Sequence, residues 1–141
     1  MTQTMAKAHR AHAVETLAGR LRYLSASSAD ASNRQDRQAI NSVIQGSAAD
    51  LLKCAMILLW GKLEALDCDI ILQIHDELIV DCKDDESTKQ RAIALLKEIM
   101  CVQAKRRLIE LHALNHKDDS SVVDVPLEES IQIGKNLGMQ E

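Results

Sequence analysis

Apolar residues recur at three- and four-residue steps along two long stretches of the chain. The first stretch begins at Arg34 or Asp36 and ends near Ala65, and the second covers residues 84–114. A period close to 3.6 residues is typical of an amphipathic α-helix. The pattern therefore predicts two long helices, and the second begins with acidic residues, as the helix dipole favours.

Two short runs of mainly β-branched residues lie between these helices, at positions 69–72 and 78–82. They are separated by the polar residues His75, Asp76 and Glu77, so the pattern predicts a β-hairpin with carboxylates at its tip. Neighbouring carboxylates repel each other, and a bound divalent cation would relieve that repulsion. On the triplet alone, exposed turn residues without a special role remain the simpler interpretation.

The patterns at the two ends of the chain are weaker. Residues 1–18 are rich in alanine with a loose apolar face and predict a helix that Gly19 ends. Residues 25–33 are polar and predict a loop, whereas residues 129–133 alternate like a half-buried strand. The expected fold class is α+β in one domain, with long helices packed on one face of a small antiparallel sheet.

Composition limits the classes of function. The 141 residues are 46% hydrophobic and 27% charged, which is usual for a globular protein. The chain has no Phe, one Trp and one Tyr, so we expect an aliphatic core and no aromatic platform for single-stranded nucleic acid. We find no apolar run that predicts a bilayer-spanning segment, and therefore expect no membrane partner.

Metal-binding patterns of cysteine and histidine are weak. The spacing of the four cysteines gives no Cys-x-x-Cys pair and favours free thiols in a reducing compartment over a zinc site. His112 and His116 have a helical spacing, but no third ligand is evident, so we expect both at the surface.

Charge is distributed unevenly. The net charge is -4, yet residues 1–62 carry +4 and the remainder carries -8. This asymmetry suits a protein that holds a polyanion at one end and a metal near its middle, although it also arises by chance. The cationic run 105–107 is expected to be a solvated face of the second helix.

Arg37, Asn41 and Gln45 stand four residues apart and share one face of the first predicted helix. Three long polar side chains in one row can contact a single extended partner. Gly46 follows immediately and interrupts the helix, at a cost of about 1 kcal/mol relative to Ala. We expect that it permits the close approach of another backbone.

Residues 37–53 closely resemble a signature helix of the family A DNA polymerases, the relatives of bacterial DNA polymerase I. Residues 73–78 match the Gln-x-His-Asp-Glu-Leu hairpin of that family, and residues 14–20 resemble its Glu-Thr-Leu-x-Gly-Arg segment. Residues 125–127 and 133–134 resemble the C-terminal strand of the family. The resemblance covers nearly the whole chain in order, and Gln38 with the block 45–50 is most similar to the eukaryotic theta and nu repair branch. A nuclear localisation follows only from that branch.

The resemblance implies catalytic roles for the hairpin. Asp76 would be one of two aspartates that hold the Mg²⁺ pair, Glu77 an auxiliary carboxylate near the metals, and His75 a neighbour of the primer terminus. Mg²⁺ prefers oxygen ligands in octahedral geometry. In the two-metal scheme, one ion activates the primer 3′-hydroxyl and the other stabilises the leaving pyrophosphate.

The resemblance also implies a DNA-binding face and its partners. Arg37, Asn41 and Gln45 match positions that contact primer and template from the minor groove, where the acceptors are nearly independent of sequence. Gln73 and Arg20 match further DNA-binding positions. The implied partners are primer-template DNA and, in the complete enzyme, a deoxynucleoside triphosphate.

The family pattern is incomplete in residues 1–141. The first catalytic aspartate, in an Asp-Tyr-Ser motif, and the nucleotide-binding fingers helix have no counterpart. We therefore expect a C-terminal palm segment that acts in DNA repair or replication but is inactive alone. A non-catalytic module that binds duplex DNA or another partner is the alternative. Single-subunit phage-type RNA polymerases also carry a His-Asp hairpin, but they lack the Gln-Gly-Ser-Ala-Ala-Asp helix.

Overall fold

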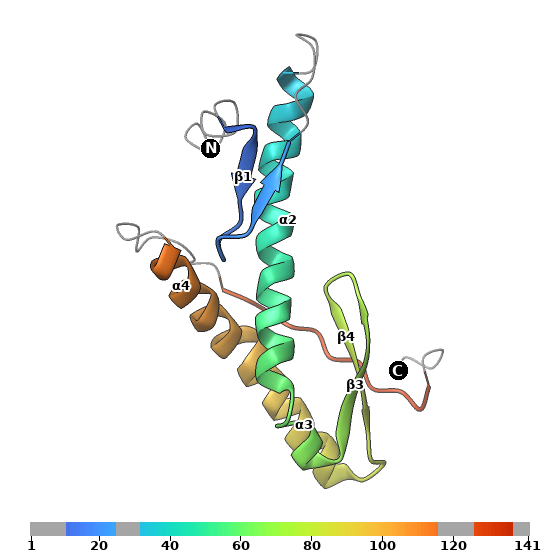
Figure 1. Cartoon of the computed structure of the whole chain (residues 1–141). Helices are drawn as coiled ribbons and strands as arrows, with labels where there is room; N and C mark the ends of the chain where they lie inside the picture. The colour runs from blue at the N-terminus through green and yellow to red at the C-terminus, as the bar shows by residue number, and fades with distance from the viewer. Residues whose placement is uncertain (1–10, 25–31, 116–125, 137–141) are drawn as a thin grey trace.

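A computed structural model describes residues 11–24, 32–115 and 126–136, with only the backbone considered at residues 32–35. A long helix, α2 (Ser32–Leu59), forms its axis (Figure 1). A hairpin of two short strands, β1 (Ala13–Glu15) and β2 (Leu21–Tyr23), lies beside the first half of α2. The mixed architecture of helices and small antiparallel sheets agrees with the expected α+β class.

The first predicted helix is confirmed, although it ends earlier than expected. After Leu59 the chain turns through Gly61, whose φ of 66° lies in the left-handed region that glycine tolerates. A short 3₁₀-helix, η2 (Glu64–Leu66), follows and ends at Asp67, which also has a left-handed φ of 54°. The final residues of the predicted helix therefore form a separate turn that leads into the next strand.

The second predicted helix is also confirmed, in three continuous parts. These are α3 (Glu86–Glu98), the π-helical turn η3 (Ile99–Gln103) and α4 (Ala104–Asn115). The helix begins two residues later than predicted because Asp85 is its N-cap, and its Oδ1 accepts a hydrogen bond from the Thr88 N–H at 2.9 Å.

The predicted central hairpin is present as β3 (Cys68–Ile74) and β4 (Glu77–Cys82). The two strands are antiparallel, and the register shifts between Ile70 and Leu72, as in a β-bulge. Among the described residues, β3 pairs only with β4 and β1 only with β2. The structure therefore has two separate two-stranded sheets, instead of one small sheet covered by helices.

Two terminal elements were predicted wrongly within the described residues. Residues 13–15 form strand β1 and not helix, because they pair with β2 and Val14 packs against Ala39 of α2. Residues 126–136 contain no strand, since no described strand lies alongside them to complete a ladder. Residues 1–10 lie outside the described residues, as does most of the predicted loop, whose last two residues instead begin α2.

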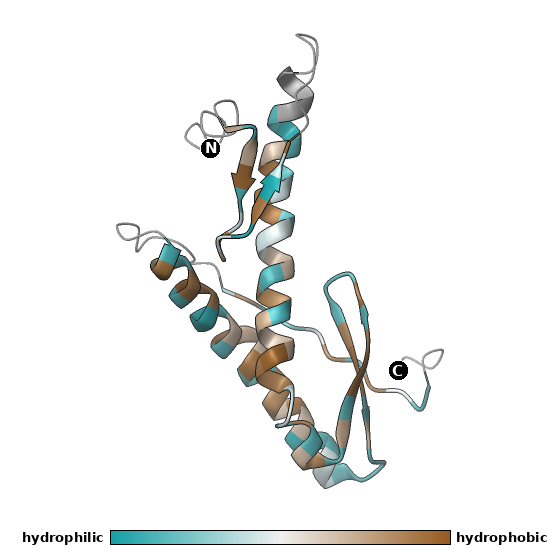
Figure 2. Cartoon of the chain, in the orientation of Figure 1, coloured by the Kyte–Doolittle hydropathy of each residue, from teal (hydrophilic) through white to brown (hydrophobic). Residues whose placement is uncertain are grey.

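The main core is aliphatic, as composition predicts. It forms where the second half of α2 meets η3 and the base of the β3–β4 hairpin, and Figure 2 shows apolar residues gathered there. Leu59, Ile99 and Cys68 are its largest fully buried side chains. A smaller cluster of Val14, Leu24 and Ala39 fixes the β1–β2 hairpin on α2.

Helix α2 corrects one expectation about membranes. Residues Asp36–Leu59 have a mean hydropathy of 1.4 over the most apolar window and are long enough to cross a bilayer. Composition of this kind is also found in core helices of globular proteins. Here Leu52, Ala55 and Leu59 are buried in the core, and 39% of the most apolar window of the helix is buried within the structure.

Candidate nucleic-acid and metal-binding site

The tip of the β3–β4 hairpin is a two-residue turn. Ile74 pairs with Glu77 across it, so that His75 and Asp76 form the connection. His75 has a φ of 54°, in the left-handed region that few residues other than Gly adopt, although Asn, Asp and His are enriched there. Gln73 stabilises this conformation, because its Nε2 donates a hydrogen bond to the His75 carbonyl at 3.1 Å. The turn that the sequence predicts is therefore formed without the usual glycine.

The side chains at this tip are exposed. Gln73, His75, Asp76 and Glu77 all lie on the surface. The carboxylate oxygens of Asp76 and Glu77 are ligands of the kind that Mg²⁺ prefers. Within residues 11–24, 32–115 and 126–136, however, no three His, Cys, Asp or Glu side chains gather closely enough to hold a metal ion. Asp76 and Glu77 therefore do not form a metal site by themselves within the described residues, and their expected role as Mg²⁺ ligands stays a prediction.

The predicted polar face of α2 is exposed along its length. Arg37, Asn41 and Gln45 are all solvent-accessible and follow one another at single-turn spacing within the 28-residue helix. Ile44 lies beside them and is 59% exposed. This face is accessible and belongs to one continuous helix, so it can lie along an extended partner.

Arg20, another predicted DNA-binding residue, is held by an ion pair with α2. Its Nε and Nη2 both lie 3.0 Å from Asp50 Oδ1, and Nη2 also donates to the Gly46 carbonyl at 3.2 Å. The Asp50 carboxylate is buried, whereas the Arg20 side chain is 49% exposed. The arrangement fixes the guanidinium at the junction of β2 and α2 and leaves part of it accessible.

Thr16, Ser47 and Asp50 complete this junction, and none of them was predicted from the sequence as a site residue. Thr16 Oγ1 donates a hydrogen bond to Asp50 Oδ2 at 2.5 Å, and Ser47 Oγ accepts one from the Leu17 N–H at 2.9 Å. Ser47 and Asp50 lie about one turn apart and thus on one face of α2. Two short polar residues at a spacing of three in a mainly apolar helix are the sequence signal that could have indicated a polar partner there.

Gly46 allows another part of the chain to approach α2 closely, as predicted. The approaching group is the Thr16 side chain and not a backbone segment. A Cβ on Gly46 would lie 2.6 Å from Thr16 Cγ2, which is too close for two carbon atoms. The expectation that another backbone would approach is therefore wrong. The glycine makes room for the Thr16 methyl group, which sits against α2 while its hydroxyl binds Asp50.

His112 is not at the surface, contrary to prediction. It is 8% exposed, and its Nδ1 lies 3.1 Å from the Leu17 carbonyl oxygen. Asn115 Nδ2 donates to the Ala18 carbonyl at 3.0 Å. These contacts attach the end of α4 to the β1–β2 turn, 95 or more residues away in sequence. His116 lies outside the described residues.

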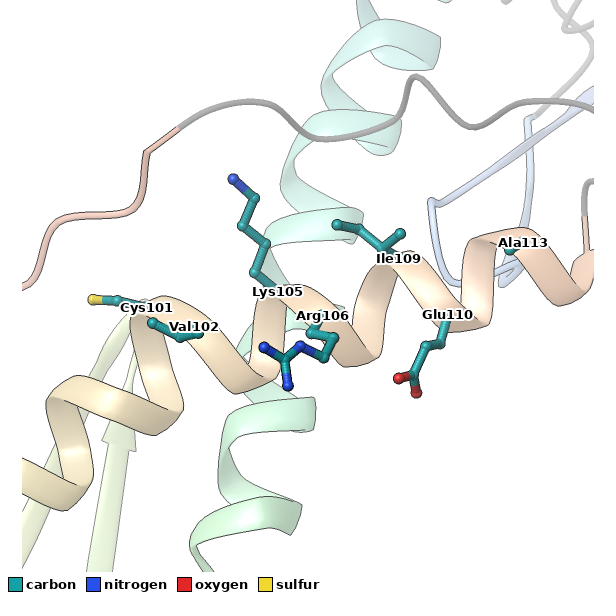
Figure 3. Close-up of a pocket in the computed structure, with 7 residues that line it drawn as sticks. All are labelled: Cys101, Val102, Lys105, Arg106, Ile109, Glu110 and Ala113. Atoms are coloured by element: carbon teal, nitrogen blue, oxygen red, sulfur yellow. The ribbon is translucent and has the colours of Figure 1, made fainter.

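A shallow groove runs along η3 and α4, away from the predicted site residues (Figure 3). Lys105 and Ile109 point to one side of the helix and Glu110 to the other. Arg106 and Arg107 are exposed, which confirms a solvated face at these two positions, whereas Lys105 is half-buried. Arg107 forms an ion pair with Glu110 at 3.0 Å.

Comparison with known proteins identifies the family. The model of DNA polymerase family A matches residues 1–139. The thermostable DNA polymerase I of Thermus filiformis is 34% identical over 126 residues, which are 87% of this chain and 13% of that protein. The corresponding enzyme of Thermus thermophilus is 40% identical over 100 residues, which are 69% of this chain and 12% of that protein.

A solved structure extends the similarity to the fold. The POL domain of Pol1 from M. smegmatis, in complex with DNA primer-template and dNTP, superposes with a TM-score of 0.64 at 32% sequence identity. The match covers 73% of this chain and 18% of that chain. The present chain thus spans a small part of the proteins it matches. On the family model and these relatives, it belongs to DNA polymerase family A.

Proposed function

We propose that this chain is the palm segment of a DNA-directed DNA polymerase that transfers nucleotides from dNTPs to a primer 3′-end in DNA repair or replication. The observation that carries the proposal is the hairpin turn of His75 and Asp76, exposed at the end of two paired strands within a family A match over residues 1–139. Primer-template DNA and dNTP, which the M. smegmatis structure contains, are the proposed partners.

Asp76 is the proposed metal ligand of this segment, with Glu77 beside it. Two carboxylates on one turn do not fill the octahedral shell of Mg²⁺, so a complete site needs donors from outside the described residues. Bound there, a divalent ion would supply charge stabilisation at the reacting phosphates. The contribution of this chain is a carboxylate at a fixed, exposed turn, with His75 next to it toward the primer terminus.

Duplex DNA is the proposed ligand of the polar face of α2. Arg37, Asn41 and Gln45 present long donors in a row, and their amide and guanidinium groups suit the acceptors of the minor groove. Arg20 supplies a second contact, since Asp50 and the Gly46 carbonyl orient its guanidinium while leaving it half exposed. Gln73 is proposed to contact the DNA near the hairpin tip.

Binding of a labelled primer-template duplex, followed by fluorescence anisotropy over a series of salt concentrations, tests this face. We expect Arg37→Ala to weaken binding several-fold and to reduce the salt slope by about 1. Lys53→Ala is the matched control, because Lys53 is an exposed cation of the same helix that lies about four turns away from Arg37. Equal effects of the two substitutions would show that the face has no specific role.

The branch of DNA polymerase family A to which the chain belongs is a further proposal. Gln38 and the block 45–50 support a place in the eukaryotic theta and nu branch, and the nucleus as the cellular location follows from that branch. Imaging of the tagged protein in a eukaryotic cell tests the location. A signal outside the nucleus would contradict it.

A non-catalytic module that binds duplex DNA is the second candidate. It is favoured by the incomplete metal site in the described residues together with the exposed face of α2. Primer extension by residues 1–141 alone tests whether this segment has catalytic activity of its own. We expect none, and extension that Asp76→Ala abolishes would show that the segment contains a complete active site.

A further inference from the structure

Two of the four cysteines face each other at the open end of the β3–β4 hairpin. Cys68 and Cys82 are direct partners across the antiparallel ladder, at the end opposite the turn. Partners in such a ladder have Cα atoms about 4.5–5.5 Å apart. That spacing lies inside the range of about 4.4–6.8 Å found in disulfides. The Cys68 thiol donates a hydrogen bond to the Leu66 carbonyl at 3.4 Å.

The two thiols differ in access to solvent. Cys68 is 2% exposed in the main core, whereas Cys82 is half-buried. Burial, the Cys82 thiol and the nearby carboxylates of Asp67 and Asp69 raise the pKa of Cys68 to about 12. A reagent in solution therefore meets Cys82 first. Cys54 on α2 and Cys101 on η3 are likewise free thiols.

We propose that Cys68 and Cys82 are a redox modification site, at which a reversible cross-strand disulfide closes the base of the hairpin. The chemistry is thiol–disulfide exchange with a low-molecular-weight disulfide such as oxidised glutathione. The Cys82 thiolate attacks one sulfur of the oxidant, which forms a mixed disulfide and releases one glutathione thiolate. Cys68 then loses its proton to solvent, and its sulfur attacks Cys82 Sγ and releases the second glutathione. The cysteines lose two electrons and the oxidant gains them.

The Cys68–Cys82 disulfide would stabilise the β3–β4 hairpin, whose turn carries Asp76. A two-stranded sheet is marginally stable by itself, and β3 pairs only with β4 among the described residues. A covalent link at the open end keeps the strands in register and removes conformations from the unfolded hairpin. The proposal concerns the thiols alone and does not depend on polymerase activity.

Mass spectrometry of the full chain tests the proposal. The chain is equilibrated in mixtures of reduced and oxidised glutathione and then unfolded in urea at low pH, so that free thiols, buried ones included, can be blocked with N-ethylmaleimide before trypsin is added. Because cleavage follows Lys62 and Lys83, both cysteines lie in one peptide, residues 63–83. We expect this peptide to appear without alkyl groups and two hydrogen atoms lighter than its reduced form. The peptides that contain Cys54 and Cys101 should remain alkylated in the same sample and serve as internal controls.

The same equilibration in concentrated urea separates the effect of the fold from sequence proximity. We expect the ratio of disulfide to dithiol to be at least about tenfold higher in the folded chain than in urea. Cys82→Ser should remove the bond, whereas Cys54→Ser should leave it unchanged. Hydrogen exchange of residues 69–81 should slow by about tenfold or more on oxidation. A ratio that is equal in urea, or alkylation of both cysteines in the folded chain, would overturn the proposal.

Discussion

At the scale of single residues, Gly46 and Thr16 decide how the β1–β2 hairpin packs on α2. The Thr16 methyl group occupies the space that a side chain at position 46 would fill, and its hydroxyl donates to the buried Asp50. Asp50 in turn holds Arg20, one of the proposed DNA contacts. A small residue in a helix thus sets the position of a guanidinium in the neighbouring β1–β2 connection.

We expect Gly46→Ala to destabilise the protein by about 1–3 kcal/mol, because overpacking outweighs the gain of about 1 kcal/mol in helix propensity. Urea unfolding followed by circular dichroism measures the effect. Thr16→Ser removes the methyl group and keeps the hydroxyl, so the double variant should recover most of the loss. Additive effects of the two substitutions would contradict the steric account.

His75 carries the second prediction at this scale. Its φ of 54° costs a β-branched residue more than it costs histidine, and costs glycine nothing. We expect His75→Val to lower the free energy of unfolding by about 1–2 kcal/mol, and His75→Gly to change it by less than about 1 kcal/mol. If valine is tolerated as well as glycine, the turn does not have the described conformation.

Residue-level prediction from the sequence was accurate where the pattern was local. The shared face of Arg37, Asn41 and Gln45 follows from helical spacing alone, and the structure leaves all three exposed. The burial of Asp50 and His112 could not be predicted in this way. Their partners, Thr16 and Leu17, lie 34 and 95 residues away and meet them only through the tertiary fold.

At the scale of elements, residues 126–136 illustrate docking without secondary structure. Glu129 accepts a hydrogen bond from the Cys101 thiol at 2.7 Å and pairs with Lys97 at 3.3 Å, so the segment is attached to α3 and η3. The Cys101 hydrogen bond and then Lys97 lower the pKa of Glu129. Burial and the Glu129 carboxylate raise the pKa of Cys101 to about 11.

These shifts predict a pH window for docking of residues 126–136. The lowered pKa of Glu129 contributes stability above about pH 4.5, which is lost as the pH falls through the folded value. The raised pKa of Cys101 contributes stability below pH 9.0, which is lost as the pH rises toward 11. Protection of the segment from hydrogen exchange, expressed relative to the intrinsic exchange rate at each pH, should be highest between these limits. Glu129→Gln should abolish the acid limb, and an unchanged limb would contradict the assignment.

Element-level prediction succeeded for the long, periodic parts of the chain. The two helices and the β3–β4 hairpin follow from hydrophobic spacing, and most of their ends lie within a few residues of the prediction, although the first helix ends at Leu59 instead of near Ala65. Residues 13–15 were predicted as helix because alanine-rich sequence favours it locally. Pairing with β2 and burial of Val14 against α2 override that preference, and neither can be seen in a window of the sequence.

At the scale of the whole molecule, several large apolar side chains remain exposed. Tyr23 and Trp60 are each 78% exposed, and Ile57 is 74% exposed. These residues belong to β2, to the last turn of α2 and to the residue after it. Single apolar side chains on a surface are common in folded proteins.

Primer extension by a chimera is the most direct test of the central claim, that the hairpin tip supplies Asp76 to a polymerase active site. Residues 1–141 would replace the matching segment of a Thermus DNA polymerase I, and the rate of extension would be measured with and without Asp76→Asn. Asp81→Asn is the control, because Asp81 is an exposed aspartate on the same hairpin, away from the turn. We predict an active chimera that loses at least about 100-fold in rate with Asp76→Asn and little with Asp81→Asn. An active chimera that tolerates Asp76→Asn as well as Asp81→Asn would contradict the account.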